Sequence, residues 1–197
     1  MAIARNVEIK ARVSDLSHLR GRLGALAPTP PAILLQTDTF FAVPRGRLKL
    51  RQCSDGSAEL IFYERPDRTG PKESQYARCA CADPQAVLAV LGHALGVRGI
   101  VEKRRELFMI GRSRIHLDDV GGLGNFLEIE VVLGAGDTPA EGERIARELL
   151  AALGIPESAL IAQAYIDLLE DPRVGSSGSR AEHRRTCARH GCSPRAL

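Results

Sequence analysis

Four short segments in which charged and apolar residues alternate constrain the fold of this chain most. They are far apart in the sequence, at residues 8–12, 49–51, 103–105 and 128–130. Alternation predicts β-strands with two unlike faces, because successive side chains of a strand point in opposite directions. One face of such a strand usually meets the core and the other meets water. If the sheet closes on itself, the charged faces line a tunnel instead.

Size and composition are those of an ordinary globular protein. The chain has 197 residues, of which 44% are apolar and 26% are charged, enough for one domain with a real core. No run approaches the roughly 20 apolar residues of a membrane span, and residues 1–5 lack the apolar stretch of a secretory signal. Five scattered cysteines favour a reducing compartment. These features predict a cytoplasmic protein with no membrane partner.

Charge is distributed unevenly along the chain. The net charge is +3, but residues 172–197 contain six arginines and one glutamate, which leaves 21 basic and 23 acidic residues in residues 1–171. The body therefore lacks the global basic field of nucleic-acid-binding proteins, and no specific nucleic-acid partner is predicted. The Arg-, Ser- and Gly-rich composition predicts a flexible tail over residues 172–197 behind one domain at residues 1–171. Cys187, His190 and Cys192 are potential zinc ligands, but their cramped spacing favours a disordered tail.

Local patterns predict a mixed α+β domain. One helix is expected between Ser14, as its cap, and Pro28, and others at residues 84–95, 139–153 and 159–170. Strands are expected at residues 5–13, 34–43, 47–52, 58–64, 73–80, 99–109, 112–118 and 126–133. In the second helix the expected buried stripe is Val87, Leu88, Val90, Leu91 and Leu95.

The short connections between these strands favour antiparallel pairing. Eight antiparallel strands can close into a barrel that is wide enough for one small ligand. The predicted fold is therefore a closed eight-stranded antiparallel β-barrel flanked by helices.

The charged residues have the spacing that a metal-bound polyphosphate requires. Such a ligand needs cations that converge from several directions and carboxylates that hold Mg²⁺ or Mn²⁺. Residues two apart on a strand share a face, so Glu128 and Glu130 can approach one metal ion. Pairs and triplets with the same spacing are Lys49 with Arg51, Lys103 with Arg105, Glu8 with Lys10 and Arg12, and Arg114 with His116 and Asp118.

Each charged pair has a plainer reading when it is taken alone. A Lys-x-Arg or Glu-x-Glu pair on a strand is usually part of a solvated face, and it is the occurrence of four segments that favours a shared site. Glu102, Arg104 and Glu106 alternate with Lys103 and Arg105, so they are expected on the solvated side. His116 is expected to be a wall residue rather than a base.

Taken in order, the segments resemble the CYTH domain, the triphosphate tunnel metalloenzyme superfamily that includes class IV adenylyl cyclases and thiamine triphosphatases. The family motif in the first strand is E-x-E-x-K, and this chain reads Asn6-Val7-Glu8-Ile9-Lys10. The later matching segments are Lys49-Leu50-Arg51, Glu102 to Arg105, His116-Leu117-Asp118 and Gly122 to Glu130. The resemblance spans residues 3 to about 170 and is strongest to the bacterial class IV cyclase branch.

The resemblance implies a triphosphate tunnel that depends on Mg²⁺ or Mn²⁺. By position, the implied metal ligands are Glu8, Glu128 and Glu130, with Asp118 as an additional one. The implied phosphate-binding residues are Lys10, Arg12, Lys49, Arg51, Arg65, Arg78, Lys103 and Arg105, with Lys10 and Arg105 assigned as catalytic. Asn6 replaces the first motif glutamate, which should weaken the metal site or move the metal toward the other carboxylates.

Three functions are compatible with such a site. A class IV adenylyl cyclase converts ATP to cAMP and pyrophosphate, and local resemblance favours this branch. A triphosphatase hydrolyses inorganic triphosphate, thiamine triphosphate or a nucleoside triphosphate. The third function is a non-catalytic polyphosphate or nucleotide sensor, for which Asn6 is the best support. No segment reads as an adenine-binding motif, and a homodimer is left open.

Overall fold

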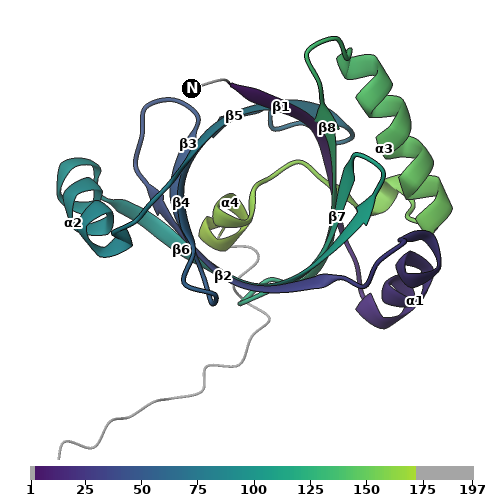
Figure 1. Cartoon of the computed structure of the whole chain (residues 1–197), viewed down its shortest axis with the longest axis horizontal. Helices are drawn as coiled ribbons and strands as arrows, with labels where there is room; N and C mark the ends of the chain where they lie inside the picture. Colours follow the sequence, from purple (N-terminus) through teal and green to yellow (C-terminus); the bar gives the residue numbers. More distant parts are fainter. Residues whose placement is uncertain (1–2, 172–197) are drawn as a thin grey trace, which may run out of the picture.

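The computed structural model describes residues 3–171, which form a barrel with helices around it (Figure 1). The strands are β1 (Ala4–Arg12), β2 (Ala32–Phe41), β3 (Arg47–Cys53), β4 (Ala58–Glu64), β5 (Lys72–Ala80), β6 (Val97–Ile110), β7 (Ser113–Val120), β8 (Gly124–Leu133) and the short β9 (Leu160–Ile161). The helices are α1 (Leu16–Leu26), α2 (Pro84–Leu95), α3 (Pro139–Leu153) and α4 (Tyr165–Glu170), with a 3-10 turn at Glu157–Ala159.

The sheet closes through strand β1. The hydrogen-bonded order is β5-β4-β3-β2-β6-β7-β8-β1, and β5 pairs with β1 to complete the ring. One edge of β1 pairs with β8 along residues 5–12, while the other edge pairs with β5 along residues 4–8. Strand β9 continues that second edge at Lys10 and Ala11. All these pairings are antiparallel, so the predicted eight-stranded barrel is confirmed, with β9 as an addition.

Where α1 and α3 cover the barrel, its apolar strand residues face outward. In β1, Val7 and Ile9 pack in a core with Leu23 of α1 and Leu153 of α3. The alternating residues of the same strand, Asn6, Glu8 and Lys10, face the lumen. This arrangement follows from the two-residue period of a strand, because one face must pack on the helices and the other is left for the interior. The charged lumen and the apolar outer surface are therefore the two faces of the same strands.

Helix α4 closes one end of the barrel. It lies inside the outline of the ring in Figure 1, and Tyr165, Ile166 and Leu168 pack in a second core with Phe126 of β8 and Val101 of β6. Tyr165 also lines the barrel cavity. The end of the domain therefore contributes to the interior of the barrel as well as to its surface.

Two expected helix boundaries are wrong. Helix α1 is capped by Asp15 rather than Ser14, because the Asp15 carboxylate accepts hydrogen bonds from the backbone N–H groups of Ser17 and His18 at 2.8 and 3.3 Å. The helix expected at residues 159–170 begins only at Tyr165. The residues before it form the 3-10 turn and β9, because pairing with the open edge of β1 satisfies their backbone groups.

Two expected burial patterns are also wrong. Helix α2 has no buried residue, and Val90 is 65% exposed, since among residues 3–171 the helix packs mainly against β2 and β3. Glu106 is buried rather than solvated, with an exposed fraction of 2%. Its carboxylate accepts two hydrogen bonds of 2.7 Å from the Arg20 guanidinium of α1, which covers this side of β6.

Three further expectations from the sequence concern membrane-spanning helices, the cysteines and the C-terminal tail. Among residues 3–171, no helix is both long and apolar enough to cross a membrane. Within the same residues Cys53, Cys79 and Cys81 carry free thiols. The expected flexible tail at residues 172–197 lies outside the described part of the chain.

We expect Gly142→Ala to destabilise the fold. A Cβ atom at this α3 position would lie 2.7 Å from Val7 Cγ2 and 3.0 Å from Leu133 Cδ2, so the helix must move off the barrel. Overpacking of this kind costs about 1–3 kcal/mol, which should exceed the gain of about 1 kcal/mol from replacing a helical glycine. Gly21→Ala in α1 is the matched control, because its Cβ would meet nothing within 4 Å and should stabilise. Urea denaturation of both variants measures the difference, and equal stabilisation would contradict the packing argument.

Candidate active site

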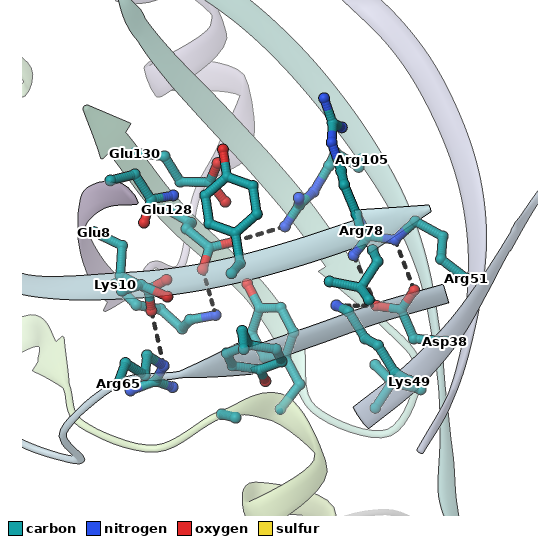
Figure 2. A pocket seen from close by; sticks show the side chains of 18 of the residues that line it. Glu8, Lys10, Asp38, Lys49, Arg51, Arg65, Arg78, Arg105, Glu128 and Glu130 are labelled. Atoms are coloured by element: carbon teal, nitrogen blue, oxygen red, sulfur yellow. Dashed lines mark hydrogen bonds and ion pairs between the residues drawn. The ribbon is translucent and has the colours of Figure 1, made fainter. Parts of the chain in front are cut away.

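The barrel encloses a cavity whose walls carry many charges, with basic residues in excess. Its basic lining residues are Lys10, Lys49, Arg51, Arg65, Arg78, Lys103, Arg105 and Arg114. Its acidic lining residues are Glu8, Asp38, Glu59, Glu128 and Glu130. Figure 2 shows Glu8, Glu128 and Glu130 gathered on one side and Asp38 among cations on the other. The excess of basic residues suits a multiply charged anion, and the gathered carboxylates suit a cation beside it.

On the acidic side, each glutamate is paired with a cation. Strands β1 and β8 place Glu8 opposite Glu130 and Lys10 opposite Glu128. Lys10 Nζ lies 2.9 Å from Glu128 Oε1, and Arg65 Nε lies 2.9 Å from Glu8 Oε1. Burial raises the pKa of Glu8, and the neighbouring charge of Glu128 raises it further.

The third glutamate of this side has a cation of its own. Arg114 Nη2 lies 2.9 Å from Glu130 Oε2. Burial opposes ionisation of Glu130, but nearby positive charge outweighs it and lowers the pKa of this carboxyl. A metal ion can therefore bind these carboxylates only if the basic side chains now paired with them release them and pair with another anion instead.

Arg105 is fixed by three acceptors. Its guanidinium donates two hydrogen bonds to the Asp118 carboxylate, at 2.7 and 2.6 Å, and one to Glu128 Oε2 at 2.7 Å. The Tyr165 hydroxyl donates to Asp118 Oδ2 at 2.8 Å. Asp118 is fully buried, and although burial opposes its ionisation, Arg105 lowers its pKa. Asp118 thus anchors Arg105, and it is not among the residues that line the cavity.

On the basic side, three cations converge on Asp38 of β2. The Asp38 carboxylate accepts from Lys103 Nζ at 2.6 Å, from Lys49 Nζ at 2.9 Å and from Arg51 at 2.7 and 2.9 Å. Burial opposes ionisation of Asp38, but the three cations outweigh it and hold its pKa well below the usual value. Sequence reasoning missed Asp38, because a lone aspartate between threonines gives no signal until β2 is paired with β3 and β6.

The lysines of this cluster ionise less readily than usual. Burial lowers the pKa of Lys103 to about 7, although Asp38 offsets part of the effect. Burial and the charge of Arg51 lower the pKa of Lys49 to about 8. Each lysine therefore gains affinity for a proton when an added anion approaches it.

We expect tripolyphosphate binding to take up protons above pH 7. A polyanion beside Lys103 and Lys49 favours their charged forms, so the pKa of each rises on binding. By linkage, affinity should then fall as pH increases from 7 to 9, because binding must first protonate these lysines. Calorimetry in buffers of different ionisation enthalpy measures the proton count directly. Zero uptake at pH 8 would contradict this expectation.

The remaining predicted residues differ in their positions. Arg65 lines the cavity, and its side chain is only 2% exposed. Arg78 also lines it but is half exposed, 3.5 Å from Glu59. Arg12 lies outside the group of cavity-lining residues, donates to the Leu123 carbonyl at 2.7 Å and stacks over the Phe126 ring.

Aromatic side chains complete the lining, and sequence reasoning missed them. Lys10 Nζ lies 3.6 Å from the centre of the Tyr165 ring, and Lys49 Nζ lies 5.5 and 5.6 Å from the rings of Phe40 and Tyr63. Cation–π contacts of this kind hold lysine side chains in place. The only available signal was the position of Phe40 and Tyr63 within predicted strands, since Tyr165 reaches the cavity through α4.

The acidic side can hold a divalent cation. Among residues 3–171, one group of three potential ligand atoms lies within 4.8 Å of one another, and it comes from His116, Glu128 and Glu130. Two polar atoms nearby, Asn6 Oδ1 in the cavity wall and His116 Nδ1, are buried without a hydrogen-bond partner. Carboxylate, amide and imidazole atoms are ordinary ligands of divalent metals, so the residues present fit such an ion.

Comparison with known proteins places this fold in a family. The CYTH domain family model matches residues 4–165, and the chain belongs to this family. Adenylate cyclase CyaB of Aeromonas hydrophila is 23% identical over 176 residues, covering 83% of this chain and 88% of the relative.

Solved structures share the barrel. The PH1012 protein of Pyrococcus horikoshii OT3 has a TM-score of 0.74 and 24% identity, covering 82% of this chain and 98% of that one. HpAC1 from Hippeastrum, described with a dominant triphosphatase activity, has a TM-score of 0.59 and 18% identity, covering 84% and 95%. At these identities the structures establish the fold alone.

Proposed function

We propose that this protein is a divalent-metal-dependent enzyme that binds a triphosphate in the barrel and cleaves a phosphoanhydride bond. In the form we favour, it is a class IV adenylyl cyclase that converts ATP to cAMP and pyrophosphate. Membership of the CYTH family and the relationship to adenylate cyclase CyaB support this choice. Mg²⁺ or Mn²⁺ is the proposed cofactor.

The pairing of carboxylates with cations across the cavity carries the proposal. Glu128 holds Lys10 and Arg105, and Glu8 holds Arg65. A triphosphate alone would draw these cations away and leave buried carboxylates without counter-charge, which is costly. A metal alone would leave the cations without partners for the same reason. A metal–triphosphate complex satisfies both sets together, so we expect each ligand to tighten the binding of the other.

The proposed roles follow from these positions. Glu8, Glu128 and Glu130 are the proposed metal ligands, whereas Asp118 holds Arg105 in place. The proposed phosphate-binding residues inside the cavity are Lys10, Lys49, Arg51, Arg65, Arg78, Lys103 and Arg105. Arg12 would have to leave the Leu123 carbonyl to join them. The metal, when bound, would neutralise phosphate oxygens and orient the phosphate chain.

In the cyclase reaction, the ribose 3′-hydroxyl oxygen bonds to the α-phosphorus while the bond from that phosphorus to the bridging oxygen breaks. The hydroxyl proton is released, and pyrophosphate leaves with the electron pair of the broken bond. Lys10 and Arg105, the proposed catalytic residues, would stabilise the charge that develops on the phosphate oxygens. Phe40 and Tyr63 offer aromatic surface near the phosphate-binding lysines, where a base could stack.

Hydrolysis of a triphosphate is the second candidate reaction. Water attacks the terminal phosphorus, and the same cations stabilise the diphosphate leaving group. The triphosphatase activity described for the structural relative HpAC1 favours this alternative. The substrate would be inorganic triphosphate, thiamine triphosphate or a nucleoside triphosphate.

Incubating the purified protein with ATP, thiamine triphosphate or tripolyphosphate, each with Mg²⁺ and with Mn²⁺, tests these proposals. Formation of cAMP and pyrophosphate supports the cyclase, whereas release of free phosphate supports the triphosphatase. Glu130→Ala should abolish either activity, and Glu148→Gln on the exposed face of α3 is the control. Tight triphosphate binding without turnover in every combination would overturn the enzyme proposal and favour a sensor.

A further inference from the structure

A buried histidine lies against the two glutamates of β8. His116 of β7 is 4% exposed and faces Glu128 in the β7–β8 register. Its Nδ1 atom lies 3.5 Å from Glu128 Oε2 and 3.8 Å from Glu130 Oε1, distances too long for a well-formed hydrogen bond to either. Buried polar atoms normally have a partner, so the unpaired nitrogen of His116 requires an explanation.

The positions of the three side chains match a small metal-binding site. Their potential ligand atoms lie within 4.8 Å of one another. A first-row divalent ion lies about 2.1 Å from histidine nitrogen or carboxylate oxygen, so ligands on opposite sides of it are about 4 Å apart. Small side-chain rotations therefore bring all three atoms onto one ion. Because β7 and β8 are adjacent paired strands, the backbone already fixes the three ligands side by side.

The neighbouring strand β1, which pairs with β8, offers a weaker ligand than the family motif does. Asn6 of β1 stands where the E-x-E-x-K motif has its first glutamate, and its buried Oδ1 atom also lacks a partner. A neutral amide attracts a cation less than a carboxylate does. The close group of three potential ligands therefore lies on β7 and β8, where His116, which is not itself among the cavity-lining residues, adds an imidazole donor beside Glu128 and Glu130.

We propose that His116 is a direct ligand of the metal, together with Glu128 and Glu130, and that this nitrogen ligand makes the site prefer Mn²⁺ or Co²⁺ to Mg²⁺. Mg²⁺ favours oxygen ligands, whereas imidazole suits transition metals. The ion's role in catalysis rests on the proposed function, but the ligand set rests only on the contacts around His116.

The test is pulsed electron paramagnetic resonance of Mn²⁺ bound to the full-length protein, first without and then with tripolyphosphate. A directly bound imidazole gives a ¹⁴N coupling that changes when the protein is labelled with ¹⁵N-histidine. We expect the coupling in the wild type and its loss in His116→Gln. In the same variant, calorimetry should show Mn²⁺ and Co²⁺ binding at least about 100-fold weaker, since loss of an outer-shell partner alone costs about 10- to 100-fold, and Mg²⁺ binding changed far less.

Two controls sample the four other histidines, His18, His93, His183 and His190. His93→Gln changes an exposed residue of α2, and His190→Gln changes one in residues 172–197, so both variants should keep the coupling and the affinity. If His116→Gln does not fold, a coupling that persists in Gln variants of His18, His93, His183 and His190 still identifies His116. Mn²⁺ bound without ¹⁴N coupling, or no Mn²⁺ binding either with or without tripolyphosphate, would overturn the proposal.

The test for a nitrogen ligand and the assays for triphosphate turnover can succeed or fail independently. Turnover of a triphosphate without a nitrogen ligand would reject the role of His116 and leave the enzyme proposal intact. A nitrogen ligand without turnover of any triphosphate would support the role of His116 as a metal ligand and reject the enzyme proposal. In the first of these cases, His116 would only contact Glu128 and Glu130 and would take no part in metal binding.

Discussion

An Arg105→Lys variant should keep the fold and lose at least about 100-fold in turnover, the usual effect of removing one preorganised donor. Arg105 donates two parallel hydrogen bonds to Asp118 and one to Glu128, so the guanidinium is held in place before substrate arrives. Lysine keeps the charge but cannot form this planar fork. Steady-state rates with the substrate found in the panel, together with thermal unfolding, measure both effects.

Arg104→Lys is the matched control, because this neighbour alternates with Arg105 on β6 and is exposed. Its turnover should stay at the wild-type level. Arg105→Ala should in addition lose about 3–5 kcal/mol of stability, since it leaves buried carboxylates without a counter-charge. Arg105→Lys with turnover within a few-fold of the wild type would show that Arg105 only supports the barrel.

The barrel could be predicted because its signal is local. A two-residue period is readable in each strand separately, and it correctly placed Lys49, Arg51, Lys103, Arg105 and both glutamates of β8 along one cavity. Short turns between the strands then left antiparallel closure as the natural arrangement. Neither step required knowledge of which distant residues touch.

The missed features depend on contacts between distant segments. Asp38 acquires its three cations only when β2 lies between β3 and β6, and the free Nδ1 of His116 is defined by its neighbours on β8. The N-terminal part of the helix expected at residues 159–170 is replaced by β9 at the open edge of β1, because backbone pairing outweighs local helix propensity. The apolar pattern of α2 indicated a helix correctly but contained no information on what covers it.

Asp38→Asn should destabilise the free protein and strengthen its binding of tripolyphosphate. The substitution leaves Lys49, Arg51 and Lys103 buried without their shared counter-charge, which is expected to cost about 3–5 kcal/mol. The same three cations then become available to phosphate oxygens, so affinity should rise at least about tenfold, a difference of roughly 1.4 kcal/mol.

The cost of Asp38→Asn should also depend on pH. Without Asp38 the pKa values of Lys103 and Lys49 fall below their present values of about 7 and about 8. The folded variant then binds fewer protons than the folded wild type below about pH 8, so by linkage its stability rises more steeply with pH there. The stability deficit should therefore be largest below pH 7, shrink as pH rises toward 8 and level off above pH 8, where the wild-type lysines have also lost their protons. Urea denaturation between pH 6 and 9, with and without tripolyphosphate, measures the deficit and its rescue. Two results would contradict this argument: a stability deficit that does not change with pH, or weaker binding of tripolyphosphate by the variant. Either would mean that Asp38 and phosphate do not compete for the same three cations.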